Sequence, residues 1–255
     1  MITLKTPAEI DAMAGAGQVV ARALRALAEH AKDGVTLTEL DEVAAQVIRD
    51  HGATSSFDGY HPRWAPSPFQ GVTCLSVNDV VVHGMPGPRI LRAGDVLSVD
   101  CGAVLDGWNG DAAITVAIGD VPDSTRRLVE STREALYAGI AQCRPGNKLG
   151  DIAAAIEAVA NRDGYGILEN HGGHGIGTAM HEEPHVSNRG RAGRGLKMRE
   201  GLVLALEPMF HAGGGDGYRT LEDGWSIATD DGSLAAHWEH SVAVTADGPR
   251  ILTES

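Results

Sequence analysis

The fold is decided by the stretch VLSVDCGAVLDGWNGDAAITVAI, which occupies residues 96–118. Two apolar runs rich in β-branched residues, 95–105 and 112–118, flank the dipeptide Asp106-Gly107. Asp-Gly between such runs is a strong signal for a tight turn. The stretch therefore predicts a β-hairpin with two antiparallel arms.

Two aspartates of this hairpin are expected to lie on the same face. If Asp106-Gly107 forms a two-residue turn, residue 102 faces residue 111, and residue 100 faces residue 113. Asp100 and Asp111 are then diagonal neighbours, about 7–8 Å apart at the backbone. Carboxylates so placed can share two metal ions about 3.5–4 Å apart. The register of the turn is the assumption behind this geometry.

Two glutamates interrupt other apolar segments in the same way. Glu207 follows Leu206 in a predicted strand, and Glu239 follows Trp238 in another. One acidic residue at a strand end is usually solvated or caps a turn. Four such residues in buried strands need compensation, because an unpaired buried carboxylate is costly. Few Lys or Arg residues are near them in the sequence, so a divalent cation is the expected partner.

The motif HEEPH at residues 181–185 matches H-E-x-x-H, the zinc-binding pattern of a protease helix. Pro184 lies inside the motif, and proline within a helix costs about 3 kcal/mol. The preceding run from His171 to Gly177 is rich in glycine, which also disfavours a helix. The match is therefore interpreted as accidental, and these histidines need another explanation.

The remaining elements predict an α+β fold in a single catalytic domain, residues 1–255, with two similar halves at roughly 1–120 and 121–255. Each half offers helices followed by antiparallel strands that carry two acidic residues. A loop is expected over 59–71. Helices are expected over 7–31, 36–52, 124–143 and 149–162, and further strands over 72–77, 80–83, 202–210, 226–229, 234–245 and 250–253.

Composition excludes several classes of protein. The net charge of −13 argues against general nucleic-acid binding. Three cysteines without a C-x-x-C motif argue against a disulfide scaffold or a thiolate zinc site. No secretory signal and no apolar run of about 20 residues is present, so neither secretion nor a membrane partner is expected. A cytoplasmic location is the simplest expectation.

Taken together, the motifs resemble those of the type I methionine aminopeptidases. The resemblance extends from the first predicted helix to the last strand, and five motifs occur in the family's order. They are NDVVVHGMP at residues 78–86, Asp100-Cys101-Gly102 with Asp111, GHGIG at 173–177 with HEEP at 181–184, LEPM at 206–209, and WEH at 238–240.

This resemblance implies the pita-bread fold, which is pseudo-twofold, with a curved antiparallel sheet and flanking helices. It also implies two divalent metal ions, with Co, Mn, Fe and Zn all open as their identity; oxygen ligands with one imidazole suit these metals. Five ligands follow from the family pattern: Asp111 and Glu239 bridge both metals, Asp100 holds one metal, and His174 with Glu207 holds the other.

The implied activity is removal of the N-terminal methionine from nascent proteins and peptides by water that the two metals activate. The resemblance implies that Glu207 is the general base and proton shuttle. It implies that His181, with the metals, stabilises the oxyanion, and that His83 hydrogen-bonds the scissile amide nitrogen. The free α-amine of the substrate would bind a metal, which restricts cleavage to the N-terminus.

Pocket positions of the family match Tyr60, Cys74 and Trp225, and an apolar pocket would suit methionine. Phe57 and Met180 fit either the pocket or ordinary core packing. His171 and His185 are expected to be structural or at the surface.

Two departures from the family occur. Asn109 replaces a usual histidine that is not a ligand, so altered surroundings of the metals are expected, with activity retained. The segment 61–70 is longer than usual, and its Trp64 is a candidate pocket aromatic. Pocket size and side-chain preference therefore stay open.

Two rival functions are considered. One is a proline-specific peptidase of the same fold, a class that usually carries an additional N-terminal domain. The other is a pita-bread binding protein that has lost catalysis, a class that typically lacks some ligands. The basic run at 188–199 is either a solvated loop or a transient contact to ribosomal RNA. A monomer is expected.

Overall fold

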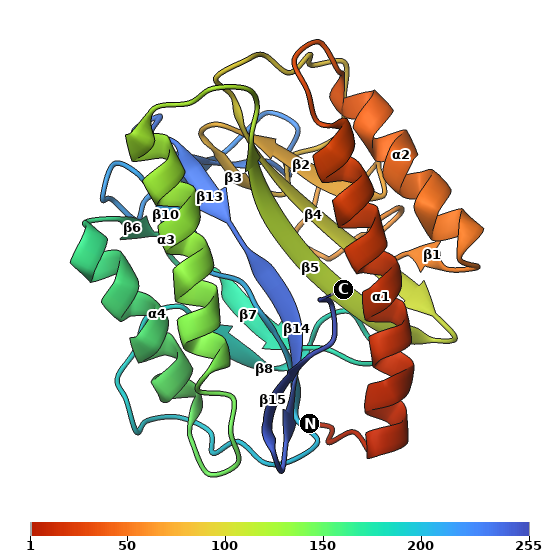
Figure 1. Cartoon of the computed structure of the whole chain (residues 1–255), viewed down its shortest axis with the longest axis vertical. Coiled ribbons are helices and arrows are strands. Elements are labelled where there is room, and N and C mark those ends of the chain that lie inside the picture. Colours follow the sequence, from red (N-terminus) through yellow and green to blue (C-terminus); the bar gives the residue numbers. More distant parts are fainter. Residues whose placement is uncertain (1, 255) are drawn as a thin grey trace.

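The hairpin predicted at residues 96–118 is present and lies inside the main sheet (Figure 1). Its arms are β4 (Val96–Leu105) and β5 (Trp108–Ala117), paired antiparallel. The turn residues Asp106 and Gly107 have φ of 50° and 83°. Positive φ at both positions is what a two-residue type I′ turn requires. The computed structural model describes residues 2–254 of the chain.

The main sheet joins strands from both halves of the sequence. β14 stands between β5 and β9, so strands from early and late in the chain are hydrogen-bonded neighbours. Within residues 2–254 its pairings are antiparallel. Its spatial order is β1 (Thr54–Ser55), β4, β5, β14 (Glu239–Thr245), β9 (Val203–Leu206), β7 (Gly172–Gly175) and β8 (Glu182–Ser187), with β2 (Thr73–Val77) on β4 and β15 (Gly248–Ile251) on β14.

Two small antiparallel sheets complete the strands. One has the order β13 (Ala235–His237), β10 (Met209–His211), β6 (Gly166–Ile167), and the other β11 (Tyr218–Thr220), β12 (Ile227–Thr229), β3 (Val80–Val82).

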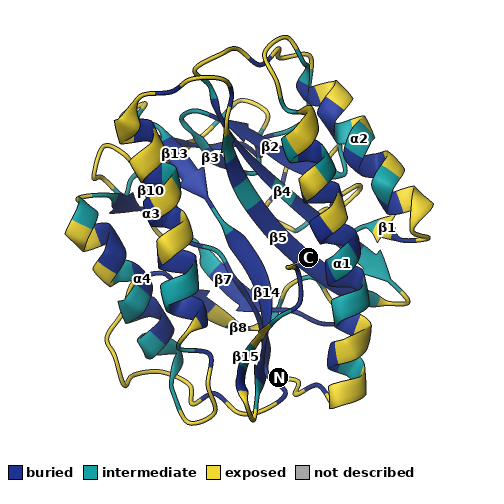
Figure 2. Cartoon of the chain, in the orientation of Figure 1, coloured by how far each residue is buried: buried dark blue, intermediate teal, exposed yellow. Residues whose placement is uncertain are grey.

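Helices cover the main sheet in two pairs, on either side of β14 (Figure 1). Each helix turns a buried face inward and an exposed face to solvent (Figure 2), as amphipathic periodicity predicts. Among residues 2–254, no helix combines the length and apolarity needed to cross a bilayer. The helices are α1 (Pro7–His30), α2 (Leu37–Asp50), α3 (Asp123–Ile140) and α4 (Leu149–Asp163).

The predicted α+β class and the four predicted helices are confirmed. Thr36 and Glu39 form a capping box with reciprocal hydrogen bonds at the start of α2. Two predicted strands are wrong in continuity, because 202–210 and 234–245 are each interrupted. Pro208 lacks an N–H for the ladder, and its carbonyl accepts from Trp238 N at 3.3 Å. The two interruptions therefore face each other.

β7 and β8 occupy the Gly/His-rich segment, where no strand is predicted. A Cβ on Gly173 would lie 2.1 Å from Ala205 O of β9. Glycine is therefore what lets β7 approach its neighbour so closely. HEEPH runs into β8 rather than a helix, which confirms that its match to the zinc-protease pattern is accidental.

Candidate active site

Acidic side chains from three adjacent strands lie on one face of the main sheet. Asp100 of β4 pairs with Ala113 of β5, and Ala113 pairs with Glu239 of β14. Asp111 lies two residues from Ala113 on the same face, opposite Gly102. The predicted register, with 102 facing 111 and 100 facing 113, is confirmed.

A second row brings in the more distant residues. Asp111 N donates to Ser241 Oγ at 3.1 Å. Ser241 pairs with Ala205, and Ala205 pairs with His174 on β7. Glu207 follows Ala205 by two residues, and strand side chains repeat with period two. Asp111, His174 and Glu207 therefore project from the same face.

The opposite face of these strands is the helix-side core. Cys101 and Ala112 are fully buried in the cluster beneath α1 and α2. Gly110 and Gly17 lie so close that a Cβ on Gly110 would meet Gly17 N at 2.7 Å. Because α1 occupies that side, the alternating aspartates face the other way, toward the cavity.

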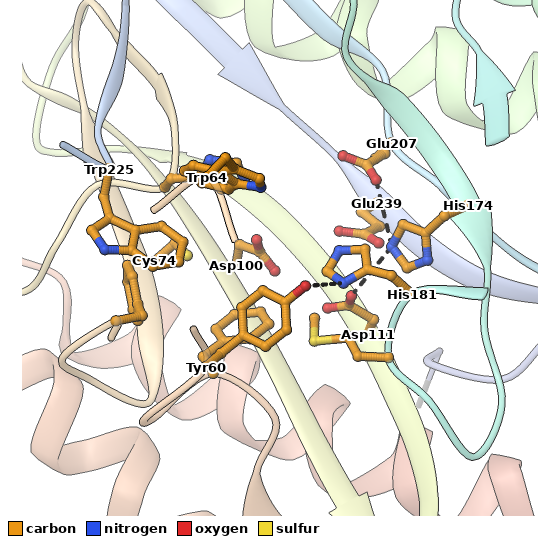
Figure 3. Close-up of a pocket in the computed structure, with 14 residues that line it drawn as sticks. Tyr60, Trp64, Cys74, Asp100, Asp111, His174, His181, Glu207, Trp225 and Glu239 are labelled. Atoms are coloured by element: carbon orange, nitrogen blue, oxygen red, sulfur yellow. Dashed lines mark hydrogen bonds and ion pairs between the residues drawn. The ribbon is translucent and has the colours of Figure 1, made fainter. Parts of the chain in front are cut away.

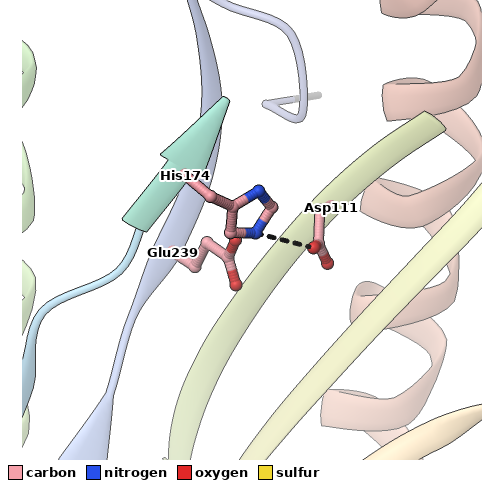
Figure 4. Close-up of side chains that lie close together, drawn as sticks. All are labelled: Asp111, His174 and Glu239. Atoms are coloured by element: carbon pink, nitrogen blue, oxygen red, sulfur yellow. Dashed lines mark ion pairs between the residues drawn. The ribbon is translucent and has the colours of Figure 1, made fainter. Parts of the chain in front are cut away.

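The side chains converge closely. His174 Nε2 lies 3.8 Å from Asp111 Oδ2 and 3.7 Å from Glu207 Oε1. Ligand atoms of Asp111, His174 and Glu239 all lie within 4.8 Å of one another (Figure 4). Residues that are up to 139 positions apart in the sequence, 100 and 239, thus meet at one place.

Burial opposes ionisation of all four carboxyls. It raises the pKa of Asp100 to about 7. For Asp111, burial and then the charges of Glu239 and Asp100 raise the pKa well above its usual value. The pKa values of Glu207 and Glu239 are raised well above normal too, first by burial and then by neighbouring carboxylates. Four negative charges are therefore not stable here without a positive partner.

The donor set fits a divalent cation. Asp100 Oδ1, Asp111 Oδ1 and Glu239 Oε1 are buried without a hydrogen-bond partner among residues 2–254. Buried polar atoms are normally hydrogen-bonded, so each needs an explanation. Burial lowers the pKa of His174 to about 3, which keeps its imidazole neutral and available as a ligand. Oxygen atoms and one neutral imidazole suit transition-metal cations.

His181 approaches this cluster from the connection between β7 and β8. Its ring centroid lies 4.4 Å from that of His174. Tyr60 Oη and His181 Nδ1 are 3.3 Å apart (Figure 3). His181 thus stands between His174 of the acidic cluster and Tyr60.

An apolar wall faces the acidic cluster across a cavity of about 290 Å³. Cys74 and Trp225, both predicted for the pocket, are buried within this wall, and Tyr60 stands at its exposed edge. Phe57 and Met180 line the same cavity. The cavity therefore has a polar floor and an apolar side (Figure 3).

Two further residues border the cavity. His83 follows β3 with φ of 59°, and its Nδ1 is buried with no hydrogen-bond partner among residues 2–254. Trp64, 60% exposed, stacks on His83 with ring centroids 6.3 Å apart. Trp64 also meets Trp225 edge-on at 4.9 Å. The long loop thus contributes an aromatic ring to the cavity mouth.

Asn109 lies away from the cavity lining. Its Nδ2 donates to Gly177 O at 3.0 Å, and its Oδ1 accepts from Ser56 Oγ at 2.9 Å. The asparagine that stands in place of the family's usual histidine therefore connects β5 to the segment that leads to His181.

The two remaining histidines of the segment 171–185 lie at the periphery of the site. His171 packs edge-on against Tyr218 at 4.9 Å and lies 6.4 Å from His83 between ring centroids. His185 is exposed on β8. Neither lines the cavity.

Two residues of the site were not identified by sequence reasoning. Phe69 lies edge-on to Trp225 at 5.1 Å and lines the cavity, although its segment is a proline-rich loop without periodicity. His237 is 2% exposed, with Nε2 3.7 Å from Glu239 Oε2. The sequence offered one signal for His237. It lies two residues before Glu239, and residues two apart in a continuous strand point to the same face.

Comparisons with known proteins agree with this geometry. Residues 11–246 match metallopeptidase family M24. The chain is 50% identical over 260 residues to "Methionine aminopeptidase 1" of Mycobacterium tuberculosis, covering 99% of this chain and 95% of that protein. The crystal structure of methionine aminopeptidase from Rickettsia prowazekii matches with a TM-score of 0.95 at 37% identity, covering 99% of this chain and 100% of that one.

A more distant match is the prolidase from Pyrococcus furiosus, with a TM-score of 0.79 at 21% identity. It covers 99% of this chain and 65% of the prolidase. This likeness shows the fold alone. The architecture is the pita-bread fold expected from the sequence motifs. With a family match over most of its length and a close relative over nearly all of it, the chain belongs to the methionine aminopeptidases of metallopeptidase family M24.

Proposed function

We propose that the protein removes methionine from the N-termini of peptides and nascent chains with two divalent cations. Asp100, Asp111, His174, Glu207 and Glu239 would hold the cations. The observation that carries this proposal is a cluster of buried carboxylates with unpartnered oxygens at the floor of an apolar cavity. Co, Mn, Fe and Zn all suit this donor set.

The cations, when bound, supply a water acidic enough to ionise near neutral pH and polarise the scissile carbonyl. Glu207 would accept the proton of the attacking water and pass it to the leaving amine. His181 would donate a hydrogen bond to the carbonyl oxygen as negative charge develops there. His83, at the edge of the cavity, would hydrogen-bond the scissile amide nitrogen.

The apolar wall would select the side chain of the first residue. Cys74, Trp225 and Tyr60 surround a space lined by sulfur and aromatic rings. A thioether packs favourably against ring edges. Methionine is therefore the side chain expected in this cavity, and Phe57, Phe69 and Met180 extend the same surface.

Peptide hydrolysis tests this function directly. The metal-loaded protein should cleave Met-Ala-Ser and leave Xaa-Pro peptides intact. Glu207→Gln should lower kcat by about 10²–10⁴-fold, the usual contribution of a general base. Preferred cleavage of Xaa-Pro would support the proline-specific alternative. Bound metal without cleavage of either peptide would support an inactive binding protein.

The proposed setting is the cytoplasm, with the protein as a monomer acting on chains that emerge from the ribosome. Arg191, Arg194, Lys197 and Arg199 are exposed in the basic run. The loop is anchored to the start of α4, where Gly150 N donates to Arg194 O at 2.9 Å. These charges would give a transient contact to ribosomal RNA. Co-sedimentation with ribosomes should weaken when they are replaced by Gln, and unchanged co-sedimentation would exclude this contact.

A further inference from the structure

His237 lies behind two of the carboxylates, outside the cavity lining. It ends β13, and its side chain is 2% exposed. Its Nε2 is 3.9 Å from Glu207 Oε2 and 3.7 Å from Glu239 Oε2. Glu207 directly follows β9 and Glu239 begins β14, so one imidazole faces carboxylates from two separate segments.

The arrangement parallels that of His174. His174 Nε2 lies 3.7 Å from Glu207 Oε1, whereas His237 Nε2 lies near the other oxygen, Oε2. Each imidazole also faces a second carboxylate, Asp111 for His174 and Glu239 for His237. Glu207 is therefore placed between an imidazole that lines the cavity and one that does not.

The position of His237 is fixed by the backbone. Thr115 Oγ1 donates to His237 O at 2.7 Å and accepts from His237 N at 2.9 Å. Ser98 Oγ contacts the same threonine hydroxyl at 2.9 Å. The imidazole Nε2 nevertheless has no hydrogen-bond partner among residues 2–254, although it is buried. A buried ring nitrogen without a partner is unusual, and its ionic neighbours here are the two glutamates.

We propose that His237 is a positioning residue that donates Nε2–H to Glu207 or Glu239 and holds these carboxylates in orientation for the cations. This inference rests on the proposed function. The present separations exceed hydrogen-bonding distance by roughly 1 Å. Hydrogen bonds of catalytic groups are often long in the unliganded protein and shorten when the site is filled. Partners of this kind raise metal affinity by orienting the ligands.

The test is cation affinity, measured by titration calorimetry with Mn²⁺ and by the visible absorption of the Co²⁺-loaded protein. His237→Leu should weaken cation binding by about 10–100-fold, the usual effect of losing such a partner. His237→Gln keeps an N–H donor and should restore most of the affinity. The Co²⁺ spectrum should change in the leucine variant, because the ligand geometry changes.

His211 provides a matched control. It lies on the neighbouring strand β10, is 1% exposed, and its Nε2 also lacks a hydrogen-bond partner within the described residues. His211→Leu should leave cation affinity unchanged, while thermal unfolding of the metal-free variants reports any general damage. Wild-type affinity and spectrum in His237→Leu would overturn the inference, as would equal losses in His237→Gln and His237→Leu. Absence of cation binding by the wild type would instead overturn the proposed function.

Discussion

Individual carboxyl side chains at the cavity floor lower the stability of the metal-free protein but favour cation binding. Asp100, Asp111 and Glu239 are packed where carboxyls resist ionisation. Each has an oxygen that no group in the described chain satisfies. Such groups cost free energy in the metal-free protein. The same feature leaves them ready to receive a cation without first breaking hydrogen bonds.

Ionisation of these carboxyls should therefore destabilise the metal-free protein as the pH rises. Carboxyl pKa values lie near 4 in the unfolded chain, and burial raises that of Asp100 to about 7 in the folded one. At Asp100 the folded state then binds more protons, so the contribution of this carboxyl to the free energy of unfolding decreases from about pH 4 to pH 7. Buried histidines such as His174 contribute in the opposite sense, because burial lowers their pKa. The slope should approach about 1.4 kcal/mol per pH unit for each carboxyl that ionises.

Urea unfolding in the presence of a chelator, at several pH values, measures this dependence. Asp100→Asn removes one of the titrating groups, so its free energy of unfolding relative to that of the wild type should increase from about pH 4 to pH 7. An identical pH dependence in Asp100→Asn and in the wild type would contradict the electrostatic picture of the site.

At the scale of elements, the connection between β7 and β8 is anchored by the N-terminal segment. Lys5 Nζ lies 2.6 Å from Glu182 Oε2, with the two side chains 3% and 14% exposed. Glu182 Oε1 also accepts from Ala179 N at 3.3 Å. Glu182 follows His181, so this buried ion pair fixes the end of the connection that carries a proposed catalytic imidazole.

Lys5→Met should destabilise the protein by about 3 kcal/mol, because it leaves a buried carboxylate without its partner. It should also lower kcat more than it changes KM, since His181 loses its support. Lys5→Arg should recover part of both. The surface pair Arg250–Asp11, 2.6 Å apart, is a matched control. Arg250→Gln should cost less than about 1 kcal/mol and leave kcat unchanged.

Element prediction succeeded where local chemistry decides the structure. The hairpin around Asp106-Gly107 and the capped helix at Thr36 follow from residues within a few positions of one another. β7 could not be predicted from local sequence. Its glycines allow close packing against β9, which lies about thirty residues later in the chain. The interruptions at Pro208 and Trp238 likewise arise from two segments that face each other only in the folded sheet.

The residues of the site show the same difference between features set by local sequence and features set by distant neighbours. The hairpin register placed Asp100 and Asp111 on one face without any knowledge of the fold. Phe69 lies in a loop without periodicity, and the residues that Phe69 and His237 contact come largely from other strands and loops. Glu207 and Glu239 stood out as acidic residues inside apolar segments, whereas His174 was identified as a ligand only through resemblance to a family.

At the scale of the whole molecule, the candidate ligands are distributed over the sheet. Asp111 is on β5, His174 on β7 and Glu239 on β14, and β14 is hydrogen-bonded to strands on both sides. A cation held by such residues crosslinks distant parts of the chain. Binding to the folded state alone raises the free energy of unfolding.

Removal of metal should therefore lower the melting temperature. A cation present at 100 times its Kd stabilises by about 2.7 kcal/mol, which corresponds to roughly 5–10 °C for a chain of this size. Thermal unfolding with and without a chelator measures the shift. Asp111→Asn should abolish the response to added metal. A melting temperature that ignores both chelator and metal would be incompatible with a cation bound to the folded protein.

The placement of Glu239 on β14 also has a consequence for faulty copies of the protein. β14 is translated after every other strand of the main sheet except β15. A copy whose synthesis stops before β14 would contain Asp100, Asp111, His174 and Glu207 but lack the carboxylate of Glu239. Errors of synthesis would then yield inert polypeptide, so the cell would not be exposed to a half-made protease.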